Sequence, residues 1–155
     1  MKLDIGSGPK PIEGYTAVDL FAESEGVIKA PMWALPFEDG TIEAINSSHS
    51  LEHIPKKQVV PTLQEFYRVL EDYGVLDIEV PSLVWCCEKW LEHQSNDWWM
   101  DIIFGNQDDS GQFHMTGFTV QILSSYLYEA GFTEFSYGKV WSHEQECLSY
   151  RVIKI

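Results

Sequence analysis

The hydrophobic pattern of residues 56–80 changes its period once, and this change constrains the fold more than any other feature of the sequence. Between Lys56 and Asp72 apolar residues recur every three or four positions, which is typical of an amphipathic helix with one buried face. Gly74 interrupts this pattern, and from Val75 to Val80 apolar and polar residues alternate as in a strand. A helix followed at once by a strand indicates a βαβ unit, and therefore a sheet with parallel strands.

The remaining segments predict the rest of this sheet. Short apolar segments that end in polar, Gly or Pro residues predict strands at residues 3–5, 15–20, 27–30 and 42–47. Further helices are expected over residues 83–93 and 119–130, with Gly131 ending the second one, and closing strands over 132–137 and 148–155. We therefore expect an α/β fold of the Rossmann-like, doubly wound type. Its sheet is mostly parallel, with an antiparallel C-terminal end and an abbreviated N-terminal part. Because no linker or repeat divides the chain, residues 1–155 are expected to form a single domain.

The charge and the cysteine content narrow the class of protein. A formal net charge of -14 disfavours nucleic acid as a partner, because proteins that bind it usually neutralise phosphates with Lys and Arg. The sequence contains no apolar run long enough to span a bilayer and no signal peptide, so no membrane association is expected. Three cysteines do not make an even disulfide framework. Together these features predict a cytoplasmic protein with a small-molecule substrate.

The strongest chemical motif lies at the end of the first predicted strand. Gly6 and Gly8 allow the backbone to turn sharply there and to approach a ligand closely. Asp19 ends the second predicted strand, where a carboxylate faces the crevice of an α/β sheet and can bind both hydroxyls of a ribose. A strand-end Asp that caps the next turn is the alternative. NAD binding is disfavoured because Pro9 and Pro11 stand where a dinucleotide site has its third glycine and its helix.

Five short motifs occur in the order found in class I S-adenosylmethionine (SAM)-dependent methyltransferases, and the sequence resembles this family over nearly its whole length. The resemblance is greatest to the small methyltransferases of the type-11 group, in which a long helix ends in Arg-Val-Leu and is followed by Gly and a strand. In this sequence the five motifs are Leu3-Asp4-Ile5-Gly6-Ser7-Gly8, Ala17-Val18-Asp19-Leu20, Leu35-Pro36-Phe37, Leu51-Glu52-His53 and Gly131-Phe132.

This resemblance implies SAM as the cofactor and, as the reaction, transfer of its methyl group by direct displacement to a small-molecule or carbohydrate-like acceptor. In that reaction the protein mainly positions the nucleophile and excludes water. The implied cofactor-binding residues are Asp4, Gly6 and Gly8 for the methionine part, Asp19 with the adjacent Leu20 for the ribose, and Leu35 and Phe37 for the adenine.

The sequence also departs from the family in ways that affect the site. Residues 9–14 are too few for the usual helix after the first strand, because a parallel crossover normally takes a dozen or more residues. The acidic residue that commonly precedes Leu-Pro-Phe and contacts the adenine is replaced by Pro31 or Met32. So short a chain leaves the substrate side open, and a homodimer that covers it is a hypothesis.

Three histidines are candidates for the acceptor side of the site. His49 follows the fourth predicted strand and is the preferred general base. His53 and His114 are candidate substrate-binding residues, with helix capping or loop packing as the alternative for each. No metal is predicted, because the histidines and cysteines lack the close spacing of a usual zinc site.

Two aromatic features of the sequence, and its function, each have more than one interpretation. The segment 96–111 contains Trp98, Trp99 and Phe104 and is expected either to form a lid or interface or to pack against the sheet edge. Tryptophans 85, 90, 98 and 99 form either an aromatic pocket or, more simply, part of the core. Alternatives for the function are a catalytically silent SAM-binding module or partner subunit, and a nucleotide-dependent oxidoreductase.

Overall fold

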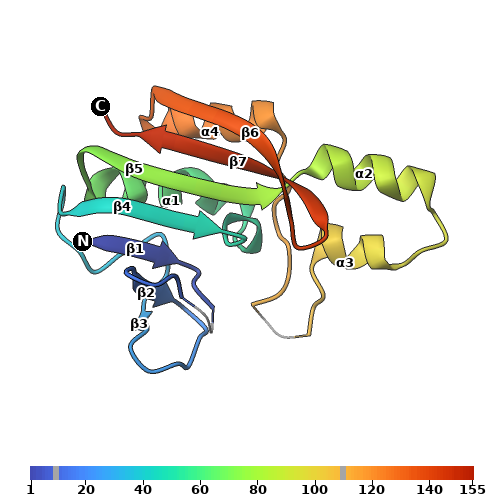
Figure 1. Cartoon of the computed structure of the whole chain (residues 1–155), viewed down its shortest axis with the longest axis horizontal. Coiled ribbons are helices and arrows are strands. Elements are labelled where there is room, and N and C mark those ends of the chain that lie inside the picture. The colour runs from blue at the N-terminus through green and yellow to red at the C-terminus, as the bar shows by residue number, and fades with distance from the viewer. Residues whose placement is uncertain (9–10, 109–110) are drawn as a thin grey trace.

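The chain folds around a seven-stranded sheet with the order β3-β2-β1-β4-β5-β7-β6 (Figure 1). The structure is a computed structural model, and it describes residues 1–8, 11–108 and 111–155. Pro9, which disfavoured NAD binding, lies outside the described residues. The strands are β1 Lys2–Ile5, β2 Thr16–Asp19, β3 Ile28–Lys29, β4 Ile42–Ser48, β5 Leu70–Pro81, β6 Glu134–Ser142 and β7 Gln145–Ile153.

The first five strands are parallel, and β7 and β6 form the antiparallel end. This arrangement confirms the predicted α/β fold with a mostly parallel sheet and an antiparallel C-terminal end. Parallel strands place their carboxyl ends at the same edge, and ligands of open α/β sheets bind outside that edge. The loops after β1, β2 and β4 therefore determine where a site can form.

The hairpin between β6 and β7 turns through two residues with positive φ, His143 at 49° and Glu144 at 63°. Positive φ at both central residues is the type I′ turn, which favours Asn and Gly. Neither residue here is of that kind, so this turn holds two side chains in an unfavourable backbone conformation.

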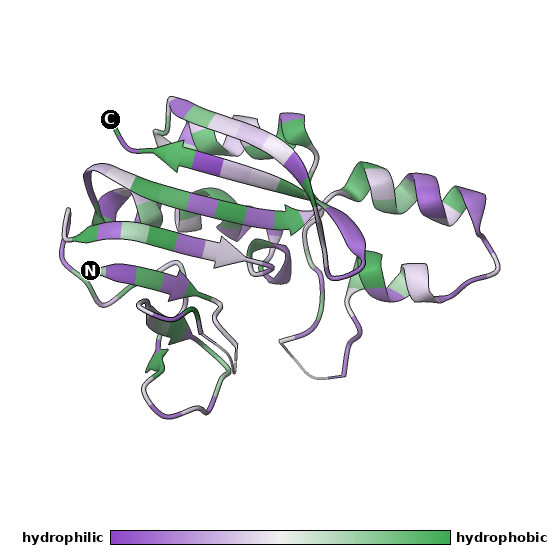
Figure 2. Cartoon of the chain, in the orientation of Figure 1, coloured by the Kyte–Doolittle hydropathy of each residue, from purple (hydrophilic) through white to green (hydrophobic). Residues whose placement is uncertain are grey.

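Two helices cover one face of the sheet, α1 Lys56–Val69 and α4 Val120–Ala130, and both lie behind it in Figure 1. Their buried side chains, such as Leu63 and Leu127, join strand residues such as Leu76 in one hydrophobic core. Figure 2 shows the resulting alternation of apolar and polar residues along β5. Helix α4 begins after Thr119, whose side chain caps it, and ends at Gly131 in the left-handed conformation, as the sequence predicts.

The other face of the sheet is polar in its central row. Asp4, Asn46, Asp77 and Arg151 are neighbours across β1, β4, β5 and β7. The Asn46 amide donates to Asp4 over 2.8 Å, and Arg151 lies 3.5 Å from Asp77. No helix among the described residues packs over this row.

The helices α2 Leu83–Glu92 and α3 Trp98–Phe104 extend beyond the end of the sheet (Figure 1). They form a separate small core in which Cys86, Trp99 and Ile102 are buried. Trp85, Trp90 and Trp98 pack against it, which agrees with core packing of these side chains. Within the part of the chain that the structure describes, none of the helices has the length and apolar character needed to cross a bilayer.

The sequence does not predict helix α3, and its other differences from the structure lie mainly at the ends of the elements. The first helix ends at Val69, and β5 begins at the next residue, Leu70, before the turn-forming Gly74. The closing strands are longer than predicted, which makes the β6–β7 hairpin reach past the end of β5 (Figure 1).

Candidate functional site

A pocket of about 470 Å³ lies at the carboxyl ends of β1, β2 and β4. Its volume is within the range of about 300–1,000 Å³ that is usual for small-molecule and cofactor sites. Six predicted site residues line it, namely Gly6, Gly8, Asp19, Leu20, His49 and His53. The remaining predicted residues Asp4, Leu35, Phe37 and His114 are not among its lining residues.

Gly6 is at the point where the loop after β1 meets the loop after β4. Its φ is +69°, and a Cβ built on it would lie 2.5 Å from the Cβ of Ser50. The Gly6 amide donates to the carbonyl of Val18 in β2 over 2.8 Å. Only glycine fits both the conformation and the space, so this residue keeps the floor of the pocket open.

Asp19 holds the two loops that form one side of the pocket. Its Oδ2 accepts a hydrogen bond from the Gly8 amide at 2.9 Å, and its Oδ1 accepts from the amides of Phe21 and Ala22 at 2.7 and 2.8 Å. An ionised carboxylate offers about four acceptor positions, so Oδ2 retains capacity for one more donor. The carboxylate caps the turn after β2, as the alternative expected, and binding of a ribose by Asp19 stays a prediction.

Asp4 supports the pocket from below. It is 4% exposed, and its two oxygens accept from the amide of Ile12 and from the side chain of Asn46. These bonds fix the loop that follows β1 against β4. In this conformation Asp4 holds the loop that carries Gly6 and Gly8.

The Leu-Pro-Phe segment is fixed to α1 by an ion pair. The Leu35 amide donates to Glu65, while the Arg68 guanidinium donates to the carbonyls of Leu35 and Phe37 and to Glu65. Arg68 lowers the pKa of the Glu65 carboxyl, chiefly through these hydrogen bonds. Leu35 is buried, and the pocket wall is formed instead by the preceding residues 30–33, which end in Met32 and Trp33.

His49 directly follows β4 and has a φ of 50°, which is unusual for a residue with a side chain. Its Nδ1 lies 3.3 Å from Glu52, and its Nε2 lies 3.2 Å from Glu79 and 3.6 Å from the sulfur of Cys147. The ring of His143, from the strained β6–β7 turn, packs against it at 4.4 Å. Contacts with four side chains therefore fix the position of the His49 ring.

The charge state of His49 follows from these contacts. Burial opposes the charged form, but the contacts with the Cys147 sulfur and with the Glu52 carboxylate outweigh it and raise the pKa of His49 to about 10. At neutral pH the side chain is then an imidazolium, with both nitrogens directed at acidic or thiol groups. A general base must be unprotonated, so His49 would have to lose this proton before it could act as one, and that role stays a prediction.

His53 and His114 meet although they are far apart in the sequence. Their rings lie 4.9 Å apart in an edge-to-face arrangement. The Nδ1 of His53 is 3.1 Å from the carbonyl of Phe113, and the Nδ1 of His114 is 2.9 Å from the carbonyl of Ile102. Burial lowers the pKa of His114, which favours its neutral form.

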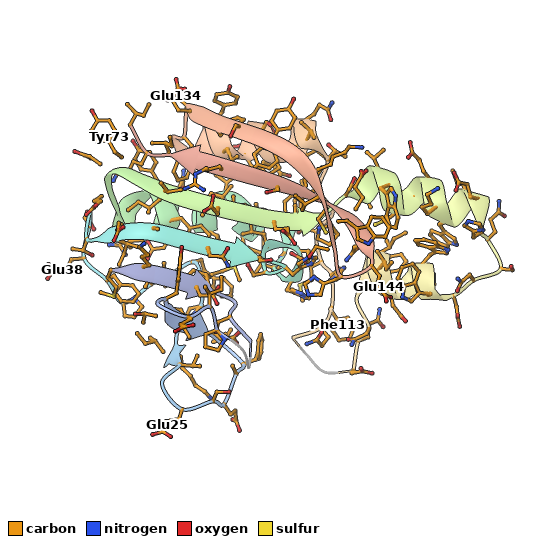
Figure 3. The ribbon with its side chains drawn as sticks, viewed as in Figure 1. Glu25, Glu38, Tyr73, Phe113, Glu134 and Glu144 are labelled. Carbon is orange, nitrogen blue, oxygen red and sulfur yellow. The ribbon has the colours of Figure 1, made fainter. Side chains whose placement is uncertain are left out.

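In Figure 3 Phe113 and Glu144 both lie at the end of the sheet beyond β4 and β5, whereas Glu38 and Tyr73 lie at the opposite end.

Several pocket residues are not predicted by the sequence. Phe21, Ser50 and Met115 line the pocket, as do Trp33 and Gln112. Phe21 follows Asp19 and Ser50 follows His49, so adjacency to a predicted residue was the available signal for both. Gln112 and Met115 come from the loop after α3, whose position depends on the tertiary fold.

The sequence matches one family of known proteins over part of its length. Residues 13–78 match the methyltransferase domain family. No curated protein matches the sequence. These findings confirm the predicted resemblance to class I SAM-dependent methyltransferases.

Three solved structures illustrate the likeness in fold. A SAM-dependent methyltransferase from Thermotoga maritima, described as a possible histamine N-methyltransferase, is 16% identical with a TM-score of 0.69, over 99% of this chain and 82% of that one. A SAM-dependent methyltransferase from Methanosarcina mazei is 17% identical with a TM-score of 0.70, over 99% and 92%. The 1,6-didemethyltoxoflavin-N1-methyltransferase of Burkholderia thailandensis, with 1,6-didemethyltoxoflavin and S-adenosylhomocysteine bound, is 18% identical with a TM-score of 0.70, over 99% of this chain and 70% of that one.

Proposed function

We propose that this chain, a class I SAM-dependent methyltransferase by its fold and its family match, methylates a small-molecule acceptor, carbohydrate-like compounds included. The observation that carries the proposal is a pocket of about 470 Å³ that Gly6, Gly8 and Asp19 line together with His49 and His53. Gly6, Gly8 and Asp19 suit a cofactor, whereas His49 and His53 suit a reacting acceptor. Their common pocket supports a reaction between the two.

The residues present fit SAM. Asp19 keeps an acceptor position on Oδ2 for a ribose hydroxyl, and Gly8 has open space where a Cβ would lie. Met32 and Trp33 offer apolar and aromatic surface for an adenine ring in place of Leu35 and Phe37. When bound, SAM supplies an electrophilic methyl group on a sulfonium.

We assign His49 an electrostatic role toward the acceptor. Glu52 and Glu79 fix its imidazolium at the pocket wall, and neither nitrogen is free to take a proton directly. Together with these two carboxylates, the imidazolium forms a fixed charged group that can orient a polar acceptor for the methyl transfer. His53 lines the same wall and is proposed to contact the acceptor, whereas His114 supports it from behind.

Several observations favour a small acceptor. A net charge of -14 disfavours the approach of a nucleic acid. The Burkholderia thailandensis neighbour has the same fold and acts on a small molecule.

We also propose a reducing cytoplasmic location, which the free cysteines Cys86, Cys87 and Cys147 support. A homodimer that covers the pocket remains a further proposal, which light scattering tests directly.

The function is tested by measuring S-adenosylhomocysteine release from SAM with a panel of acceptors. The panel contains small alcohols, phenols, amines and mono- and disaccharides, with tRNA and duplex DNA for comparison. We expect product with members of the small-molecule panel and none with the nucleic acids. Turnover with nucleic acid alone would overturn the proposed acceptor class, and SAM binding without any turnover would favour a silent binding module.

A further inference from the structure

Glu52, His53 and His114 form a compact cluster beside the pocket. Glu52 and His53 belong to the short 3-10 helix Leu51–His53 after β4, and His114 lies in the loop after α3. One nitrogen of each imidazole and one oxygen of the carboxylate lie within 4.8 Å of one another. We propose that these three side chains bind a divalent transition-metal ion, in contrast to the expectation from sequence spacing.

The hydrogen bonds of the two histidines are those of metal ligands. Each Nδ1 lies at hydrogen-bond distance from a backbone carbonyl, His53 from Phe113 and His114 from Ile102. A carbonyl only accepts, so both Nδ1 atoms carry a proton, and in the neutral imidazole each Nε2 then keeps a lone pair for a metal. Histidines that bind a metal almost always donate their other ring N–H in this way.

Glu52 supplies an independent indication. The residue is 1% exposed, and neither of its carboxylate oxygens has a hydrogen-bond partner among the described residues. Oε1 lies 3.3 Å from His49, outside hydrogen-bond geometry, and this is its single ion-pair contact within the described part of the chain. Buried carboxylates are normally hydrogen-bonded, paired or bound to a metal. A bound cation would balance the negative charge of the carboxylate and give its second oxygen, Oε2, a partner.

The cluster is held in place before any ion arrives. The backbone carbonyl of Glu52 accepts from the amides of Met115 and Thr116 at 2.7 and 3.1 Å, and the Thr116 hydroxyl donates to the carbonyl of Ile54 at 2.7 Å. These bonds join the 3-10 helix to the loop that carries His114. The ligands would therefore need little rearrangement, which favours binding.

Two imidazoles and one carboxylate define the class of ion. Zn²⁺ and Fe²⁺ accept this ligand set, and three protein ligands leave a position open. Because His53 and Met115 line the pocket, the cluster borders the acceptor side. This part of the inference rests on the proposed function: an acceptor oxygen or nitrogen that bound the ion would become more acidic.

A second cluster, His49, Glu79 and Cys147, also brings three ligand atoms within 4.8 Å. We favour the first cluster because both nitrogens of His49 already face acidic groups, Glu52 and Glu79. The two clusters differ in one chemical respect, since the second contains a thiol. That difference makes them separable by spectroscopy.

The test is titration of the full chain, freed of metals by a chelator, with Zn²⁺ followed by calorimetry and with Co²⁺ followed by absorption. We expect one ion per chain, a cobalt spectrum without a thiolate charge-transfer band, and a higher Tm with Zn²⁺. Glu52→Gln and His114→Gln should each weaken binding by more than the roughly 10–100-fold that loss of a supporting partner costs. Cys147→Ser and the exposed His93→Gln are the matched controls and should bind like the wild type.

Three results would overturn the proposal. One is the absence of binding to a chain whose circular dichroism and cooperative unfolding show that it is folded, as expected if Glu52 only pairs with His49. The others are loss of binding in Cys147→Ser and unchanged binding in both Glu52→Gln and His114→Gln. SAM binding is measured on the same preparations, so a failure of the metal site is distinguishable from a failure of the proposed function.

Discussion

Replacing Gly6 by alanine adds one carbon atom at the tightest point of the pocket. That Cβ would lie 2.5 Å from the Cβ of Ser50, and the Gly6 φ of +69° is unfavourable for any other residue. The left-handed conformation costs about 1–2 kcal/mol for a residue with a Cβ. Overpacking adds about 1–3 kcal/mol. We therefore expect Gly6→Ala to lower the free energy of unfolding by roughly 2–5 kcal/mol.

Gly8 provides the matched control for this change. Its φ is also positive, at +56°, but a Cβ on it would have no neighbour within 4 Å. Gly8→Ala should therefore cost only the conformational part, about 1–2 kcal/mol. Ser50→Gly removes the atom that Gly6→Ala would meet, whereas Ser50→Ala keeps it. Only Ser50→Gly should restore stability when combined with Gly6→Ala.

Urea unfolding followed by far-ultraviolet circular dichroism measures these differences in a double-mutant cycle. We expect a favourable coupling of about 1–3 kcal/mol between Gly6→Ala and Ser50→Gly and almost none with Ser50→Ala. Equal losses in Gly6→Ala and Gly8→Ala would refute the reasoning. So would a coupling that does not depend on which residue replaces Ser50.

Two further predictions concern the parts that support the pocket. Because Arg68 lowers the pKa of Glu65, the ion pair stabilises the fold above the ordinary carboxyl pKa and loses this effect as the pH falls through the lowered value. The stability difference between wild type and Glu65→Gln, measured by urea unfolding, should therefore shrink below about pH 4, and a difference independent of pH would contradict this. In the β6–β7 turn, Glu144→Gly should raise the free energy of unfolding by about 1 kcal/mol, because glycine tolerates the φ of 63°. A lower Tm for this variant would show that the Glu144 side chain contributes more than its backbone strain costs.

The elements that the sequence predicts well are those with a local signal. The periodicity of residues 56–80 gives α1 and β5, and Gly131 marks the end of α4. Helix α3 was missed because Trp98–Phe104 is apolar at almost every position and shows no period. It is stabilised by packing of Trp99 and Ile102 against α2, which is a tertiary contact.

The site shows the same division between local and tertiary signals. Gly6, Gly8 and Asp19 could be predicted as pocket residues because each lies at or just after the end of a strand, and the ends of parallel strands meet. Leu35 was expected at the adenine, but the ion pair of Glu65 and Arg68 holds its segment against α1, so that residues 30–33 line the pocket instead. The approach of His114 to Glu52 could not be predicted from spacing, since it depends on where the loop after α3 folds back.

The most direct test of a SAM site is calorimetric titration of the purified protein with SAM and with S-adenosylhomocysteine. It is performed on the wild type, on Asp19→Asn and on Asp101→Asn, whose side chain is exposed on α3 outside the pocket. We predict saturable binding of one ligand per chain, weakened in Asp19→Asn and unchanged in Asp101→Asn. Absence of binding to the folded wild type, or equal binding by Asp19→Asn, would contradict the assignment of this pocket to the cofactor.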